Sequence, residues 1–151
     1  MPIFIRNESR RFKIDSGKIK KQFKAILKNL SIEEKELSVL LVNDRKIKNL
    51  NHLYRYKSSP TDVLSFPQIE EEDGFDSILL GDVVVSLETA ERQAKEHGLT
   101  FEEEVIMLIT HGLLHLLGYD HEISIQEEKR MQKKTLELFQ LVFPYKKSFS
   151  S

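Results

Sequence analysis

Residues 105–121 read VIMLITHGLLHLLGYDH, and this stretch determines more of the predicted architecture than any other part of the chain. From Val105 to Leu117 the residues are apolar almost all round a helix, which is typical of a helix enclosed by the rest of a domain. Gly118 can then end the helix, because glycine readily adopts the positive φ angle that helix C-termini often need. The stretch therefore predicts a buried helix followed by a turn.

Three histidines in the same stretch are spaced for one metal ion. His111 and His115 are four residues apart, so on a helix their side chains project from one face, with Cβ atoms roughly 5–6 Å apart. The turn at Gly118 can bring His121 back toward that face. Because buried imidazoles need polar partners, a shared metal explains the pair better than two separate core histidines. We predict that His111, His115 and His121 bind the metal.

Zn²⁺ is the expected ion, at one per chain. Three neutral imidazoles leave zinc its full charge and an open fourth position, which lowers the pKa of a bound water to about 7. That arrangement indicates a hydrolytic centre. The alternative, a closed structural site, needs a fourth protein ligand, and cysteine is absent from the chain. The remaining candidates for that ligand are Asp120, Glu122, His52 and His97.

The histidine spacing also matches the zinc ligands of metzincin proteases, with one difference. Those enzymes carry a glutamate directly after the first histidine as general base, whereas this chain has Gly112 there. A glycine cannot accept a proton. A peptidase would therefore need a base from elsewhere in the chain, which makes proteolysis the less favoured interpretation.

At this point the sequence resembles a known family. The motif HGLLHLLGYDH, residues 111–121, resembles the signature of the YbeY family of bacterial endoribonucleases. Residues 50–67, LNHLYRYKSSPTDVLSFP, and residues 80–86, LGDVVVS, resemble two further blocks of that family and occur in the same order. The resemblance implies a zinc-dependent endoribonuclease specific for single strands, acting in rRNA processing, including maturation of the small-subunit rRNA 3′ end, and in ribosome quality control.

The resemblance also implies particular contacts with RNA. Arg55 alone would be read as a surface charge, but it stands where the family has a functionally important arginine. Its planar guanidinium suits phosphate oxygens, so Arg55 is the predicted catalytic residue. Tyr119 and Phe66 are expected to pack in the core, although either could stack on a base. The implied partners are single-stranded RNA, ribosomal RNA and ribosomal particles.

Two alternatives from other classes remain open. One is a non-catalytic ribosome-assembly factor whose metal only fixes the fold. The other is a metallopeptidase-like hydrolase. The residues leave the scissile bond, the general base, the physiological metal and the oligomeric state undetermined.

Length, charge and composition are those of a compact soluble protein. The chain has 151 residues and a net charge of −1, so its overall charge gives no attraction to nucleic acid. Five lysines lie within residues 18–28, where we expect a solvated helix face rather than a surface that tracks RNA. Residues 1–15 lack the apolar run of a secretory signal, and no apolar run is long enough to span a membrane. A cytoplasmic location without membrane attachment is expected.

Periodicity predicts an α+β fold in a single domain over residues 1–151. The resemblance implies the same fold and one domain of the YbeY type. The expected architecture is a small mixed sheet covered by helices, with the buried helix carrying the histidines. Thr100 with Glu103, and Ser124 with Glu127, are predicted capping boxes, and Asp44 is a predicted helix cap. Strands are expected at 3–7, 36–43, 63–66 and 79–86, and helices at 18–30, from 44, at 87–97, from 100 to the turn at 118, and from 124 to about 143.

Four polar residues outside the motif need an interpretation of their own. Asp62 and Asp82 could accept the second ring N–H of a metal-bound histidine, although Asp62 could equally organise a turn. His97 at a helix C-terminus is most simply a surface residue that offsets the helix dipole, and His52 is expected to be solvated.

Overall fold

A computed structural model describes residues 3–55, 62–67, 78–119 and 124–146, apart from the side chains of residues 54 and 55. Over these residues the chain forms one mixed sheet and five helices, which confirms the predicted α+β class. The strands are β1 (Ile3–Asn7), β2 (Glu36–Val42), β3 (Val63–Pro67) and β4 (Leu79–Ser86). The helices are α1 (Ser16–Asn29), α2 (Asp44–Arg55), α3 (Leu87–His97), α4 (Phe101–Leu116) and α5 (Ile125–Val142).

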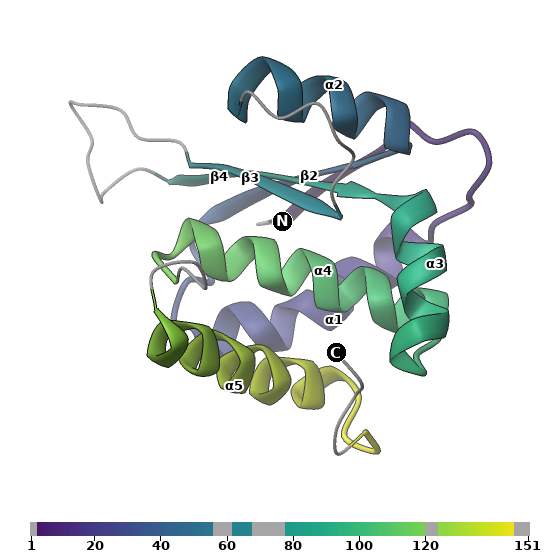
Figure 1. Ribbon diagram of the computed structural model, residues 1–151. Coiled ribbons are helices and arrows are strands. Elements are labelled where there is room, and N and C mark those ends of the chain that lie inside the picture. Colours follow the sequence, from purple (N-terminus) through teal and green to yellow (C-terminus); the bar gives the residue numbers. More distant parts are fainter. Residues whose placement is uncertain (1–2, 56–61, 68–77, 120–123, 147–151) are drawn as a thin grey trace.

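The sheet has the strand order β1-β2-β4-β3. Strands β1, β2 and β4 run parallel, and β3 pairs with β4 in the antiparallel direction at one edge. Figure 1 shows α2 on one side of the sheet and α1, α4 and α5 on the other. In the part of the chain that the structure describes, no helix combines the length and apolar character needed to cross a bilayer.

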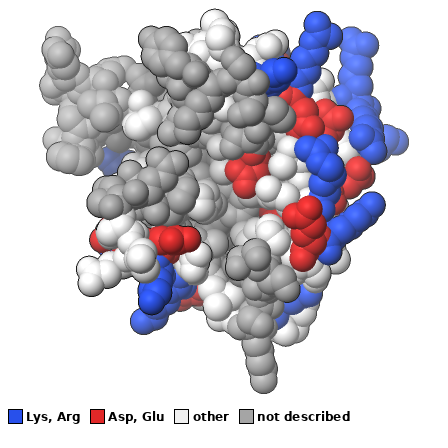
Figure 2. All heavy atoms as spheres, in the orientation of Figure 1, with Lys and Arg blue, Asp and Glu red and all other residues white. Residues whose placement is uncertain are grey.

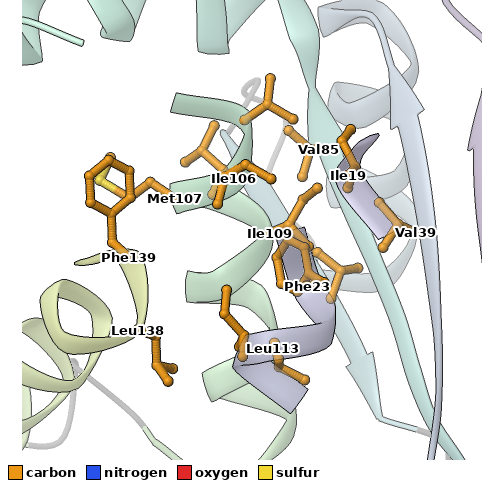
Figure 3. Close-up of a cluster of buried hydrophobic side chains, with 14 of the residues drawn as sticks. Ile19, Phe23, Val39, Val85, Ile106, Met107, Ile109, Leu113, Leu138 and Phe139 are labelled. Atoms are coloured by element: carbon orange, nitrogen blue, oxygen red, sulfur yellow. The ribbon is translucent and has the colours of Figure 1, made fainter. Parts of the chain in front are cut away.

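The main core lies between the sheet and the layer of α1, α4 and α5. Side chains from α1, β2 and β4 meet those of α4 in the close-up of Figure 3, with α5 on the far side of α4. Phe23 of α1, Ile109 of α4 and Phe139 of α5 are all fully enclosed. A smaller apolar cluster fills the space between α2 and the other face of the sheet. Helix α4 is therefore surrounded on most sides, as its sequence predicted.

Both ends of α4 are fixed by local hydrogen bonds. At its start, the Thr100 side chain accepts from the backbone of Glu103 and the Glu103 side chain accepts from the backbone of Thr100, so the predicted capping box is present. At its end, Gly118 has a φ of 100° and donates its N–H to His115 O, while the N–H of Tyr119 bonds to Leu114 O. This pair of bonds is a Schellman motif, and it confirms the predicted turn at Gly118.

The cap of α2 differs from the prediction. Asn43, not Asp44, accepts the hydrogen bond of 2.8 Å from a backbone N–H in the first turn. The Asp44 carboxylate instead accepts hydrogen bonds from Ser86 at 2.5 Å, Thr89 at 2.6 Å and Arg92 at 2.9 Å, at the start of α3. Partial burial acts to raise the pKa of Asp44, but these hydrogen bonds outweigh it and lower the pKa below its ordinary value. Asp44 thus ties α2 to α3.

Candidate functional site

The two helical histidines meet on the last two turns of α4. Their Nε2 atoms lie 3.2 Å apart, their rings cross at 69°, and both side chains are partly buried. Two nitrogen ligands about 2.0–2.1 Å from a tetrahedral zinc ion lie roughly 3.3–3.4 Å apart. The same distance suits a hydrogen bond between one protonated and one unprotonated nitrogen. His111 and His115 therefore have the separation that two ligands of one tetrahedral ion require.

The third predicted ligand cannot be placed in the same way. His121 lies outside the described residues, and so do Asp120 and Glu122, two candidates for a fourth ligand. Within the described residues, no three histidine, aspartate or glutamate side chains are grouped to hold a metal ion. The predicted set of His111, His115 and His121 therefore stays a prediction, of which two members are shown to converge.

Gly112 has a packing role at the position where a metzincin has its glutamate. A Cβ atom on Gly112 would lie 2.6 Å from Val83 Cγ1 and 3.1 Å from Val63 Cγ2, well inside ordinary contact distance. The absent side chain lets α4 approach β3 and β4 closely, and the Ser65 hydroxyl of β3 donates to the Gly112 carbonyl at 2.9 Å. A glutamate has no room here, so this fold excludes the metzincin general base.

Arg55, the predicted catalytic residue, is the last residue of α2. Its backbone belongs to the helix that covers the opposite face of the sheet from α4, as Figure 1 shows. The position of its side chain lies outside the described part of the structure. Its contact with phosphate stays a prediction.

The hypothesis that Asp82 orients an imidazole is wrong. Side chains alternate between the two faces of a strand, and Val83 faces α4 at Gly112. The neighbouring Asp82 therefore points to the opposite face, where it lines a cavity with Phe4 of β1. The carboxylate and the two histidines lie on different sides of the sheet.

Asp62 lies just before β3, where its backbone carbonyl accepts from the N–H of Ser86. Its negative charge is one of the lesser causes that raise the pKa of Glu104 on α4. Whether it orients a histidine ring stays a prediction.

His97 is not the simple surface residue that its helix position suggests. Its Nδ1 makes a short contact with Glu104 Oε1, its side chain is only 17% exposed, and the Glu104 side chain is fully buried. Burial is the main cause that raises the pKa of Glu104, and His97 acts in the opposite direction. Sequence reasoning missed Glu104. The available signal was its position seven residues before His111, which places a carboxylate on the histidine face of a buried helix.

Two surface expectations can be compared directly with the structure. His52 is exposed on α2, as expected. Most lysines of the α1 face are exposed, and Lys18 pairs with Glu102 of α4 at 2.9 Å. On the face shown in Figure 2, acidic and basic side chains lie next to one another. The exposed lysine side chains agree with the solvated face that was expected.

Comparison with known proteins identifies relatives over nearly the whole chain. The sequence model of the family described as Endoribonuclease YbeY matches residues 4–142. The chain is 50% identical to Endoribonuclease YbeY of Aquifex aeolicus over 121 residues, which is 80% of this chain and 79% of the relative. It is 41% identical to the protein of the same name from Syntrophus aciditrophicus, covering 99% of this chain and 94% of that one.

A solved structure is also similar. The solution structure of TM1509 from Thermotoga maritima superposes with a TM-score of 0.65 at 33% sequence identity. The match covers 95% of this chain and 90% of the other. The arrangement of sheet and helices is thus shared with a solved protein.

Proposed function

Because the chain belongs to the YbeY endoribonuclease family, whose members are hydrolases acting on RNA, we propose that it is a zinc-dependent endoribonuclease specific for single strands. The proposed substrate is ribosomal RNA in ribosomal particles of the cytoplasm, with roles in maturation of the small-subunit rRNA 3′ end and in ribosome quality control. The observation that supports a metal-dependent mechanism best is the 3.2 Å separation of the His111 and His115 Nε2 atoms.

The proposed metal ligands are His111, His115 and His121. When bound, a zinc ion supplies a Lewis acid for a phosphoryl oxygen and lowers the pKa of water. Two of these imidazoles, those of His111 and His115, belong to a buried helix that is capped at its start. Because coordinating imidazoles must be unprotonated, metal affinity should fall on acidification.

Arg55 is proposed to offset the negative charge that develops at phosphorus. A guanidinium stays charged at any working pH and can donate two parallel hydrogen bonds to phosphate oxygens. The tight packing at Gly112 leaves no glutamate beside the first histidine to act as a base. RNA supplies its own nucleophile for internal attack, because its 2′-hydroxyl lies beside the scissile phosphate; the hydroxyl proton would pass to solvent as the bond from phosphorus to the 5′-oxygen breaks. Flexible single strands also reach the in-line geometry that an A-form duplex denies.

The decisive experiment measures zinc content and RNA cleavage in matched histidine variants. Purified protein should hold one zinc ion, and His115→Ala should lose most of the metal and the cleavage of unstructured RNA. His52→Ala removes an exposed histidine from α2 and should change neither. Full metal content in both His111→Ala and His115→Ala would refute the site.

The choice of substrate separates the proposal from its alternatives. We expect cleavage of unstructured RNA, little cleavage of duplex RNA and no digestion of casein. A cut that disappears with a 2′-deoxy sugar at the scissile position indicates internal attack, and a cut that survives indicates water as the nucleophile. If folded, zinc-loaded protein binds ribosomal particles but leaves RNA intact, the protein is an assembly factor and not an enzyme. Chelator-sensitive digestion of casein would indicate a peptidase.

A further inference from the structure

The sheet has a cavity on the face opposite α4. Its volume is about 530 Å³ and it opens beside α2, which covers only part of this face. Aliphatic side chains of β2, β4 and α2 form its walls, and polar and aromatic side chains come from all four strands. The lining residues that matter here are Phe4, Arg6, Ser38, Leu50, Phe66 and Asp82.

Four of these residues form one row across the sheet. Phe4 pairs with Ser38, Ser38 with Asp82, and Asp82 with Phe66 in the strand register. Neighbouring strands are about 4.8 Å apart, so the row spans roughly 14 Å. Two aromatic rings therefore stand at its ends, with a hydroxyl and a carboxylate side by side in the middle. We call this set the cross-sheet row.

The polar centre of the row is available to a ligand. None of the described residues donates a hydrogen bond to the Asp82 carboxylate or forms an ion pair with it. Phe4 is 51% exposed, so one side of its ring is open to a ligand. Arg6, the next residue of β1 on this face, is highly exposed and lies 3.6 Å from Glu8.

We propose that this cavity binds an unpaired guanine base of the RNA on which the protein acts. The Watson–Crick edge of guanine presents two donors, N1–H and the N2 amino group, beside one acceptor, O6. A carboxylate only accepts hydrogen bonds, and a serine hydroxyl can donate one. Asp82 would accept from N1 and N2 while Ser38 donates to O6. Adenine would place its N1 acceptor against the carboxylate and is disfavoured.

The ends of the row supply the other contacts that a base needs. Bases of single-stranded RNA stack on aromatic side chains displayed by sheets, so Phe4 would act as the platform. Arg6 beside the cavity can approach the phosphate of the same nucleotide. That positive charge also disfavours the main rival occupant, a lysine or arginine side chain of a partner protein. The ligand identity rests on the proposed ribonuclease function, while the cavity and the row do not.

The cavity and the histidine pair lie on opposite faces of strands β3 and β4. Asp82 follows Gly81, whose Cβ position would lie 3.0 Å from the Leu116 side chain at the end of α4. His115 is the residue before Leu116. A strand of RNA bound in the cavity could therefore reach the histidines by passing around the β3 edge of the sheet.

An NMR titration with nucleotides tests the cavity without requiring cleavage. Guanosine 5′-monophosphate has no internal phosphodiester bond, so the zinc-loaded protein cannot cut it as an endonuclease. It should shift the backbone amides of Phe4, Ser38 and Asp82 and bind about tenfold more tightly than adenosine 5′-monophosphate. Inosine 5′-monophosphate lacks the N2 amino group and should fall between them.

Variants of Asp82 and Phe4 complete the test. Asp82→Asn should remove the preference for guanine, and Phe4→Ala should lower the affinity for both nucleotides about tenfold. Glu33→Gln, which makes the same charge change at an exposed loop residue, should leave both affinities unchanged. Equal affinities for the two nucleotides in the unaltered protein, or a guanine preference that survives Asp82→Asn, would overturn the proposal.

Two further outcomes separate this proposal from related ones. If guanosine monophosphate leaves these amides unmoved while a lysine- and arginine-rich peptide shifts them, the cavity is a protein-binding site and our proposal is wrong. A protein that binds guanine as described but cuts no RNA would keep the cavity and remove the proposed ribonuclease activity. If the protein cuts RNA without any preference for nearby guanine and the nucleotides shift no amides, the ribonuclease activity stands and the proposed guanine site is wrong.

Discussion

Gly112→Ala should destabilise the protein, although the same change stabilises most helix interiors. The new Cβ would lie 2.6 Å from Val83 Cγ1, whereas carbon atoms in contact are normally about 3.5–4.0 Å apart. Helix α4 must therefore move away from the sheet by about 1 Å, or Val83 must change its rotamer. Overpacking of this kind costs about 1–3 kcal/mol, and the gain in helix propensity returns about 1 kcal/mol. We expect a net loss of about 1 kcal/mol.

For a chain of this length, that loss corresponds to a fall of about 2–4 °C in melting temperature. Urea unfolding of both proteins, with and without Val83→Ala, measures the effect and its cause. Val83→Ala removes two of the three methyl groups that the new Cβ would meet, including the nearest one, so Gly112→Ala should cost less in that background. An unchanged penalty in the Val83→Ala background would refute the packing argument. An increase in stability from Gly112→Ala alone would refute it more directly.

Three further perturbations test other parts of the molecule. Arg55→Ala should keep the zinc and the fold but lower cleavage about 10²-fold, and Arg55→Lys should restore only part; normal turnover by the alanine variant removes Arg55 from the mechanism. Asp44→Asn should cost about 2 kcal/mol near pH 7. Because folding lowers the pKa of Asp44, its contribution to the free energy of unfolding is present above the unfolded pKa of about 3.9 and is lost as pH falls through the folded value. The difference in unfolding free energy between Asp44→Asn and the unaltered protein, measured with urea, should therefore close on acidification. Thr100→Ala should lower the unfolding free energy by about 1 kcal/mol through loss of the α4 cap, and an unchanged urea midpoint would contradict that role.

Local signals in the sequence predicted the elements well. Thr100 and Glu103 mark the start of α4, Gly118 marks its end, and both lie within a few residues of the groups that they bond. The boundaries of β4 and α3 are also as predicted, because Ser86 and Gly98 are a helix cap and a helix terminator. Such signals need no knowledge of distant contacts.

Interactions between distant segments could not be predicted in the same way. Asp44 looked like a cap because it precedes a helix, but its partners come from the start of α3. His97 looked exposed because its partner, Glu104, belongs to the next helix. Period-two alternation separates the two faces of β4, yet valines on both faces hide which one meets α4, so Asp82 could not be assigned to a side.

The enclosure of α4 has a consequence for how the candidate site fluctuates. Amide hydrogens exchange with solvent through local opening where backbone is exposed, and only through global unfolding where an element is packed on all sides. Nearly every residue from Glu103 to Leu114 is buried, so the amides in the middle of α4 should be among the slowest to exchange. The backbone that carries His111 and His115 would then hold its shape for as long as the protein stays folded. A metal or a substrate arriving at these imidazoles meets a geometry whose ordering entropy was already spent during folding.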